Sequence, residues 1–184
     1  MRAAPRLIAV LLALLLAPAL APQAAAQHAP RAETRDWDYF VDFRARFSSR
    51  IGHTFIAYGR IDRRGRIVEE RYAGLYPKDK YGHFLAIAAF AGPAYAVPAY
   101  IGTDKNDRDE PVVANYRRRL SAAGFARLQS TLRRMQTAQP RWHLFFYNCN
   151  DFAAQVAQAM GMVTPPSLAP PPLYVNALAA LNGK

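Results

Sequence analysis

Hydrophobic and polar residues alternate along two early stretches of the chain, a pattern typical of half-buried strands. In Tyr39–Phe47, apolar side chains alternate with charged ones, so we predict a strand there. Residues 54–61 and 67–76 are rich in β-branched and aromatic residues and flank a polar turn, Asp62–Gly65. A glycine-containing turn between two such runs indicates a β-hairpin. We predict this hairpin over Thr54–Tyr76, packed against a helix that begins near Cys149.

A different period, with apolar residues three and four positions apart, predicts two helices in the second half of the chain. The first follows Ser121, a residue type that caps helix N-termini, and ends near Pro140. The second covers about Asn150–Met160 and is followed by Gly161, which suits the position after a helix C-terminus. Their apolar stripes are Phe125, Leu128, Leu132 and Met135 in the first helix, and Phe152, Val156 and Met160 in the second.

The remaining segments complete a mixed order of strands and helices. Trp142–Tyr147 is predicted as a short strand that leads directly into the second helix. Residues 84–101 are apolar but interrupted by glycine and proline, residues 105–110 are predicted as a solvated loop, and residues 174–181 as a short helix. This order predicts one α+β domain with a small antiparallel sheet packed against helices.

The first 26 residues have the organisation of a secretory signal peptide. A basic start with Arg2 and Arg6 precedes an apolar run, and three alanines at 24–26 suit a cleavage site. Prolines interrupt the run before it reaches the length of about 20 residues that a membrane span needs. We therefore expect a periplasmic or secreted protein with no transmembrane segment after signal removal. Residues 27–35 would form a loose arm and residues 36–184 a single domain.

The chain is strongly basic. It has 24 Lys and Arg residues against 13 Asp and Glu, a formal charge of +11. Removal of Arg2 and Arg6 with the signal peptide leaves 22 basic residues and a charge of +9. Such a charge favours contact with polyanions, which for an exported protein are envelope polymers or lipid headgroups; the alternative is a basic surface that is only solvated. The basic residues are scattered and no nucleic-acid-binding module is recognisable, so we expect no nucleic-acid partner.

Cys149 is the one cysteine of the chain, so no intramolecular disulfide can protect it in an oxidising compartment. It lies where the predicted strand meets the predicted helix. Unpaired N–H groups and the helix dipole there favour the nucleophilic thiolate, which predicts a lowered pKa. The same N–H groups can stabilise an oxyanion, and the polar neighbours Asn148 and Asn150 are candidates to support that role. The alternative is a small, buried and inert side chain.

A nucleophilic thiol needs a base, and His53 is the best-placed histidine. It begins the first strand of the predicted hairpin, where a side chain can reach a cleft at the rim of the sheet. His28 lies in the predicted arm, His83 in a loop, and His143 in the strand that precedes Cys149. Four scattered histidines and one cysteine match no usual zinc-ligand spacing, so we expect neither a metal nor a cofactor.

Residues 52–56 (GHTFI) and 148–152 (NCNDF) resemble motifs of the circularly permuted branch of the NlpC-like, papain-fold superfamily. That branch includes relatives of lecithin:retinol acyltransferase and PPPDE-type peptidases. In it, a histidine on an early strand precedes a cysteine that begins a late helix in an Asn-Cys-x-x-Phe pattern, and this chain has the same order. The resemblance covers these two segments and implies a compact permuted papain-like fold, with Cys149 as nucleophile and His53 as base.

The chain departs from that family at the residue that orients the histidine. In the superfamily, a polar residue on the neighbouring strand has this role. Centring the hairpin on its turn places His53 opposite Gly74, with Tyr72 and Tyr76 as diagonal neighbours and Glu70 further along the same face. We therefore expect Tyr72 or Glu70, rather than His83, to orient His53, unless a backbone carbonyl does so or the site is a two-residue dyad.

These observations predict an exported cysteine hydrolase, an amidase or peptidase, that acts as a monomer. Cys149 would attack an amide or ester carbonyl, His53 would take its proton, and water would hydrolyse the acyl-enzyme. By resemblance and location, a cell-wall peptide amide is the first expected substrate and a lipid acyl group the second. The alternatives are an acyltransferase or lipid thioesterase-like enzyme on the same fold, and a non-catalytic envelope binding module that needs no reactive thiol.

Overall fold

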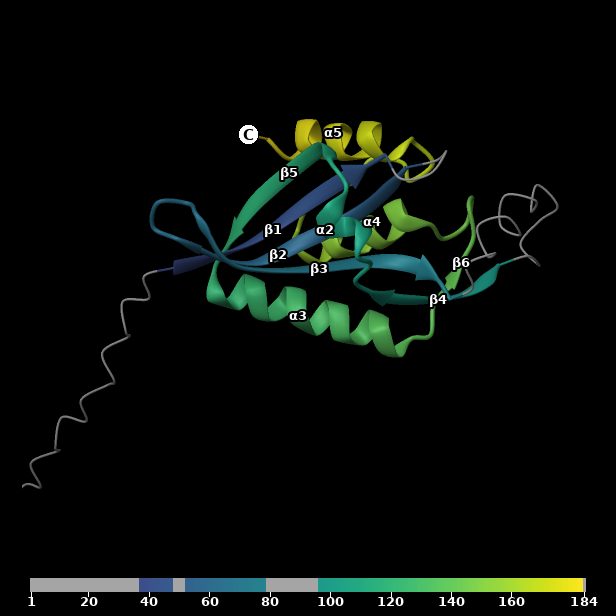
Figure 1. The fold of residues 1–184 in the computed structure, drawn as a ribbon, viewed down its shortest axis with the longest axis horizontal. Coiled ribbons are helices and arrows are strands. Elements are labelled where there is room, and N and C mark those ends of the chain that lie inside the picture. The colour runs from purple at the N-terminus through teal and green to yellow at the C-terminus, as the bar shows by residue number, and fades with distance from the viewer. Residues whose placement is uncertain (1–36, 48–51, 79–95, 184) are drawn as a thin grey trace, which may run out of the picture. The chain divides into compact units, whose positions relative to one another are not determined.

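A six-stranded antiparallel sheet in the order β5-β1-β2-β3-β4-β6 carries the helices of this computed structural model (Figure 1). The structure describes residues 37–47, 52–78 and 96–183. The predicted signal peptide, the arm, most of the interrupted apolar segment, His28 and His83 lie outside these ranges. The described strands are β1 (Trp37–Arg46), β2 (His53–Asp62), β3 (Ile67–Pro77), β4 (Val97–Gly102), β5 (Val112–Leu120) and β6 (Arg141–Trp142).

The described helices are α2 (Asn106–Asp109), α3 (Ala122–Thr137), α4 (Cys149–Ala159) and α5 (Pro171–Asn182). Local chemistry explains the ends of two of them. The hydroxyl of Ser121 accepts the N–H of Gly124 at 3.1 Å, so Ser121 is the N-cap of α3. Gly161 follows α4 with φ +74°, a backbone conformation that glycine adopts without strain. The predicted strand at Tyr39–Phe47, the hairpin and the helices are confirmed. None of the described helices has the length and hydrophobicity to cross a membrane.

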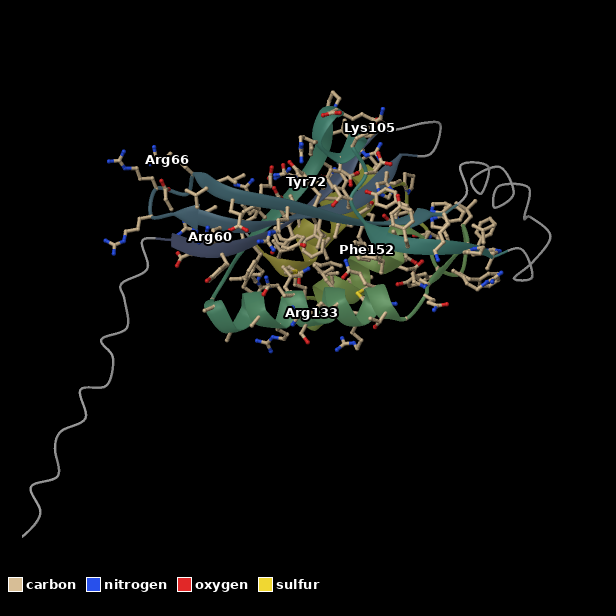
Figure 2. All side chains as sticks on the ribbon, turned by 60° about the horizontal axis from the view of Figure 1, so that its bottom comes forward. Arg60, Arg66, Tyr72, Lys105, Arg133 and Phe152 are labelled. Atoms are coloured by element: carbon tan, nitrogen blue, oxygen red, sulfur yellow. The ribbon has the colours of Figure 1, made fainter. Side chains whose placement is uncertain are left out.

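One face of the sheet packs against α3, α4 and α5 and forms the main hydrophobic core. Successive residues of a strand point to opposite faces. The side chains on this helix face include Val41, Phe43, Ala45, Thr54, Ile56, Ala73 and Leu75. The other face, called the polar face below, carries Asp42, Arg44, Arg46, His53, Phe55, Glu70, Tyr72 and Tyr76. In Figure 2, Phe152 of α4 and Arg133 of α3 lie on one side of the sheet, and Tyr72 on the other.

The segment that precedes α4 differs from the prediction. Only Arg141–Trp142 is a strand, whereas a strand was expected over Trp142–Tyr147. His143 and Tyr147 exchange two backbone hydrogen bonds of 2.9 and 3.2 Å, so the chain reverses direction between them. The N–H of Phe145 donates to Nδ1 of the buried His143 at 3.1 Å, which stabilises the reversal. His143 therefore lies in a tight turn rather than at the far end of a strand.

Three further elements were not predicted. β4 lies at the end of the interrupted apolar segment, for which no strand was expected. Residues 105–110 were expected to form a solvated loop, but they contain α2, and Asp107 in that helix is buried. β5 was not recognised because three consecutive arginines, Arg117 to Arg119, obscure the alternation of a strand. β5 lies at the edge of the sheet, where exposed charged side chains are common because they oppose pairing with other chains.

Candidate thiol site

Cys149 is the first residue of α4, and Asn148 caps this helix. Oδ1 of Asn148 accepts the N–H groups of Asn150 (2.7 Å) and Asp151 (3.3 Å). In return, Oδ2 of Asp151 accepts the N–H of Asn148 at 2.8 Å, which completes a capping box. The predicted position of Cys149 on the first turn of a helix is confirmed, whereas a turn takes the place of the strand expected before it. Cys149 lies at the positive end of the helix dipole.

Asn150 connects the first turn of α4 to β2 and to the segment before α5. Its Oδ1 accepts the hydroxyl of Thr54 at 2.5 Å, and its Nδ2 donates to the carbonyls of Ser167 (2.8 Å) and Ala169 (2.7 Å). Nδ2 of Asn148 likewise donates to backbone carbonyls. Both amides therefore hold the chain together, and neither offers a spare N–H to an oxyanion as the sequence suggested.

The thiol of Cys149 lies against the start of β2. Cys149 is half-buried as a residue. Burial of its thiol has the largest effect and raises the pKa of Cys149 overall, whereas the N–H and hydroxyl of Thr54 and the N–H groups of Cys149 and Asn150 lower it. The direction is opposite to the lowered pKa predicted from the helix dipole, so the neutral thiol is favoured at neutral pH. The hydroxyl of Thr54 has one proton, so donation to sulfur competes with its bond to Asn150.

His53 begins β2 next to Thr54, so the backbone brings it to the same end of the sheet as Cys149. The two neighbouring side chains leave the strand on opposite faces: Thr54 on the helix face and His53 on the polar face. The ring centroid of His53 lies 4.8 Å from that of Tyr76 and 6.1 Å from that of Phe55. His53 therefore has an aromatic neighbour where the sequence suggested Tyr72 or Glu70.

The register of the hairpin explains this difference. Phe55, and not His53, pairs with Gly74. Ile61 pairs with Ile67, so the turn is centred half a residue later than expected, and this moves each partner by one position. A β-bulge beside Ile61 moves the partners by one position more. Continuing this register to the end of β2 brings His53 opposite Tyr76, two positions beyond Gly74.

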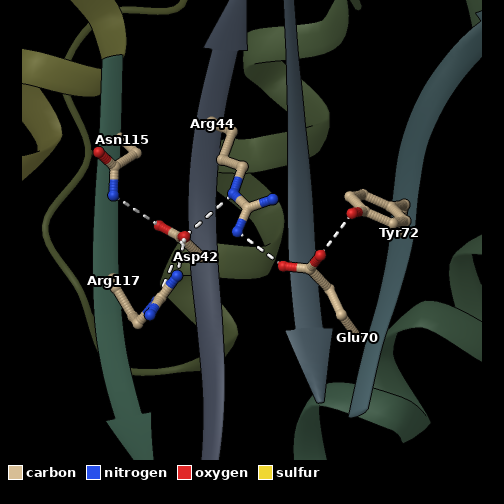
Figure 3. Close-up of polar contacts among 6 residues, drawn as sticks. All are labelled: Asp42, Arg44, Glu70, Tyr72, Asn115 and Arg117. Carbon is tan, nitrogen blue, oxygen red and sulfur yellow. Dashed lines mark hydrogen bonds and ion pairs between the residues drawn. The ribbon is translucent and has the colours of Figure 1, made fainter. Parts of the chain in front are cut away.

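Tyr72 and Glu70 belong to a polar network on the polar face (Figure 3). The hydroxyl of Tyr72 donates to Glu70, and Glu70 accepts Nη2 of Arg44 at 2.7 Å. Tyr72 pairs with Ala57, four residues along β2 from His53. The two candidate orienting groups thus bind each other and Arg44, and the structure does not bring them to His53.

The same network continues across the sheet to β5. Asp42 is 1% exposed, and its carboxylate accepts Nε of Arg44 at 3.0 Å, Nη2 of Arg117 at 3.0 Å and Nδ2 of Asn115 at 3.2 Å (Figure 3). A buried carboxylate needs such partners, because an unpaired charge in the interior is costly. The network therefore stabilises the pairing of β1 with its neighbours, a structural role that the sequence pattern did not indicate.

A second buried cluster fixes the aromatic neighbour of His53. The hydroxyl of Tyr76 donates to Asp107 of α2, and Nε of Arg46 donates to the same carboxylate at 3.1 Å. Nη1 of Arg46 donates to Glu110 at 2.8 Å. Burial raises the pKa of Tyr76, so its phenol stays a donor. No residue pattern indicated this cluster, because α2 was expected to be a solvated loop.

The start of α5 closes the same end of the sheet as Cys149. Gly52, just before β2, has φ +79°, and a Cβ there would lie 3.2 Å from the carbonyl oxygen of Arg46 and 3.4 Å from Cγ of Pro171. Tyr174, in the first turn of α5, is fully buried. Sequence reasoning missed Thr54 and Tyr174, because both reach Cys149 through contacts between distant parts of the chain.

Within the ranges that the structure describes, no group of three or more His, Cys, Asp or Glu side chains is arranged as metal ligands. The candidate site consists of the thiol, the first turn of α4, the start of β2 and the start of α5. Comparison of the chain with models of protein families, with curated proteins and with solved structures finds no match.

Proposed function

We propose that this protein is an exported cysteine hydrolase of the permuted papain-like (NlpC-like) type, with Cys149 as nucleophile. The observation that supports it most directly is the position of the thiol. It lies on the first residue of a capped helix, where the N–H groups of Thr54, Cys149 and Asn150 lower its pKa. Such a position joins a nucleophile to N–H groups that can stabilise negative charge on an attacked carbonyl oxygen.

The reaction needs a base, because burial keeps the thiol protonated before attack. His53 is the proposed base. It is the chain neighbour of Thr54, whose N–H and hydroxyl lower the thiol pKa. Its ring lies against Tyr76 on the polar face, opposite to the face of Thr54, so the base role requires the ring to leave this position. The proposal requires the imidazole to come within about 3–4 Å of the sulfur when the proton is transferred.

The substrate of this proposal is a cell-wall peptide amide, with a lipid acyl group as the second candidate. The basic residues at the tip of the β2–β3 hairpin, Arg63, Arg64 and Arg66, are exposed and suit anionic envelope polymers or lipid headgroups. Figure 2 shows Arg66 at this end of the sheet, whereas Cys149 lies near the start of β2, at the opposite end of that strand. A basic contact surface at the tip would therefore leave free the end of the sheet at which the thiol lies.

A non-catalytic envelope binding module is the second candidate, and one observation favours it. The raised pKa of the buried Cys149 thiol is what an inert structural cysteine shows. Acylation of the thiol distinguishes the two functions, since a binding module needs no nucleophile.

The test is acylation by p-nitrophenyl acetate, followed by intact-protein mass spectrometry. The hydrolase should acquire one acetyl group on Cys149 and then lose it, whereas Cys149→Ala should acquire none. His53→Gln should slow acylation at pH 7 by about 100-fold or more, the usual contribution of a general base. His143→Gln, which changes another imidazole of the described structure, should acylate at the wild-type rate.

Each other result removes a specific part of the proposal. If the wild-type protein is not acylated and reagents do not reach its thiol, the hydrolase is excluded and the binding module remains as the supported function. Acylation that depends on His143 and not on His53 would support Cys149 as nucleophile but would identify His143, rather than His53, as the base.

A further inference from the structure

Tyr174 carries a buried hydroxyl that the fold does not use. The residue is 0% exposed, and among the described residues its hydroxyl has no hydrogen-bond partner. A buried hydroxyl without a partner costs folding free energy, and native proteins usually satisfy such groups. A buried hydroxyl without a partner near a candidate nucleophile therefore indicates that a bound ligand accepts its hydrogen bond.

The contacts of α5 place its first turn, which carries Tyr174, beside the candidate thiol site. The carbonyl of Pro170 accepts the N–H of Tyr174 at 2.9 Å, and the preceding carbonyl, that of Ala169, accepts Nδ2 of Asn150 at 2.7 Å. The first turn of α5 is therefore linked to the first turn of α4. Burial is the main cause that raises the pKa of Tyr174, and the charges of Asp151 and Cys149 add to it. The phenol thus remains protonated and can donate.

The other polar side chains of the site have no proton to spare. The amides of Asn148 and Asn150 donate to backbone carbonyls, and Asn148 accepts the N–H groups of Asn150 and Asp151. The proton of Thr54 is given to Asn150. An oxyanion site usually has two donors or more, and the hydroxyl of Tyr174 is the unused donor in the described site.

We propose that the hydroxyl of Tyr174 donates a hydrogen bond to the carbonyl oxygen of the acyl group that Cys149 attacks, together with the N–H of Cys149. This inference rests on the proposed function. It makes Tyr174 a catalytic residue, since its hydroxyl would touch the reacting oxygen.

The step balances without a further reagent. The sulfur of Cys149 forms a bond to the carbonyl carbon, the thiol proton passes to His53, and the π pair of the carbonyl moves to oxygen. Tyr174 keeps its proton and donates a hydrogen bond to this oxyanion. When the intermediate collapses, the carbonyl re-forms, the bond to the leaving group breaks, and His53 returns the proton to that group.

Two reactions of the same thiol test this role. Acylation by p-nitrophenyl acetate passes through an oxyanion, whereas alkylation by iodoacetamide does not. Tyr174→Phe should slow acylation by about 100-fold, the usual effect of losing one oxyanion donor. It should leave the alkylation rate within about twofold of wild type and should not lower the melting temperature, because the hydroxyl has no partner in the resting protein. Tyr58→Phe, a partly buried tyrosine that packs against the same core, should change neither rate.

The outcomes separate this inference from the function on which it rests. Equal losses in both rates would show that Tyr174 acts on the thiol itself and would overturn the donor role, as would unchanged acylation. A wild-type thiol that is alkylated but never acylated would contradict the hydrolase, and the donor role with it. That failure appears in the wild-type protein, whereas failure of the donor role alone appears only in the variant.

Discussion

At Cys149, two physical influences act on one sulfur atom in opposite directions. N–H groups at the start of α4 and from Thr54 stabilise the thiolate, whereas removal from water stabilises the thiol. Desolvation can shift a pKa by several units, and a few partly shared hydrogen bonds do not offset it here. The neutral thiol is therefore the favoured form in the resting protein.

This balance predicts a slow and strongly pH-dependent thiol. Because burial raises the pKa of Cys149 above the ordinary value of about 8.5, iodoacetamide should react more slowly than with a free thiol at pH 7. The rate should continue to increase with pH beyond the value at which a free thiol levels off. Rates measured by mass spectrometry between pH 6 and 10 would test this, and a rate above that of free cysteine at pH 7 would contradict it.

The raised pKa of Cys149 also makes the stability of the fold depend on pH. Between the unfolded and the raised folded pKa, the folded protein binds more protons at Cys149 than the unfolded chain. The contribution of the thiol to stability is thus full below about pH 8.5 and is lost as pH rises toward the folded pKa. Urea unfolding at pH 7 and pH 9 should show a decrease in the wild type that is smaller in Cys149→Ala. An equal decrease in both proteins would mean that the thiol is as solvated in the fold as in the unfolded chain.

At the scale of elements, the first turn of α4 has two functions, helix capping and connection of distant segments. Asn148 caps the turn and also bonds to the preceding loop, whereas Ser121 only caps α3. The two caps therefore offer a matched pair of substitutions.

Asn148→Ala and Ser121→Ala should each lower the free energy of unfolding, by about 1 kcal/mol for loss of the cap alone. Asn148→Ala should cost more, because its amide also bonds to Leu144 and Ser167. It should also change the alkylation rate of Cys149, whereas Ser121→Ala should not. Urea unfolding and thiol alkylation measure both effects. Identical thiol reactivity in the two variants would show that the cap does not position the thiol.

Elements with a strong local signal were predictable. The hairpin has a glycine turn between β-rich runs, and α3 and α4 have caps and apolar stripes within a few residues of each other in sequence. β5 and α2 lack such signals, since an arginine-rich edge strand and a four-residue helix are stabilised mainly by contacts with the rest of the fold. The hairpin register depended on a β-bulge, which no residue type announces.

The candidate site divides in the same way. The junction at Cys149 follows from local sequence, and the predicted position at the start of a helix is confirmed. Thr54 and Tyr174 are far from Cys149 in sequence, and only the packing of β2 and α5 brings them near. The pKa of Cys149 was predicted in the wrong direction because burial is a property of the folded molecule.

For the molecule as a whole, the large positive charge is not uniformly available at the surface. Arg44 and Arg46 are largely buried in ion pairs, whereas Arg63 and Arg64 project from the hairpin tip. These two arginines are therefore not among the basic groups that a partner can meet, and the carboxylates that they contact offset their charge. The exposed basic groups include this tip.

Binding to anionic vesicles tests whether the tip contacts lipid headgroups. The protein should bind phosphatidylglycerol-containing vesicles more weakly as salt increases. Arg63→Gln with Arg64→Gln should reduce binding by about tenfold or more, given about 1 kcal/mol per basic residue near an anionic surface. Arg133→Gln with Arg134→Gln removes the same charge from exposed positions of α3 and is the control. Equal losses in the two double variants would mean that net charge, and not the tip, drives binding.

The contribution of α5 to the site has a consequence for the time at which the site forms. Ser167, Ala169 and Tyr174 follow every strand of the described sheet in the chain, yet they bind or surround the first turn of α4. A ribosome produces these residues only after it has produced Cys149 and the whole sheet. A nascent chain that stops before α5 would therefore expose its thiol to oxidants and other chains, without the partners that hold the first turn of α4. Synthesis of α5 is thus the step that gives the first turn of α4, and with it Cys149, its folded surroundings.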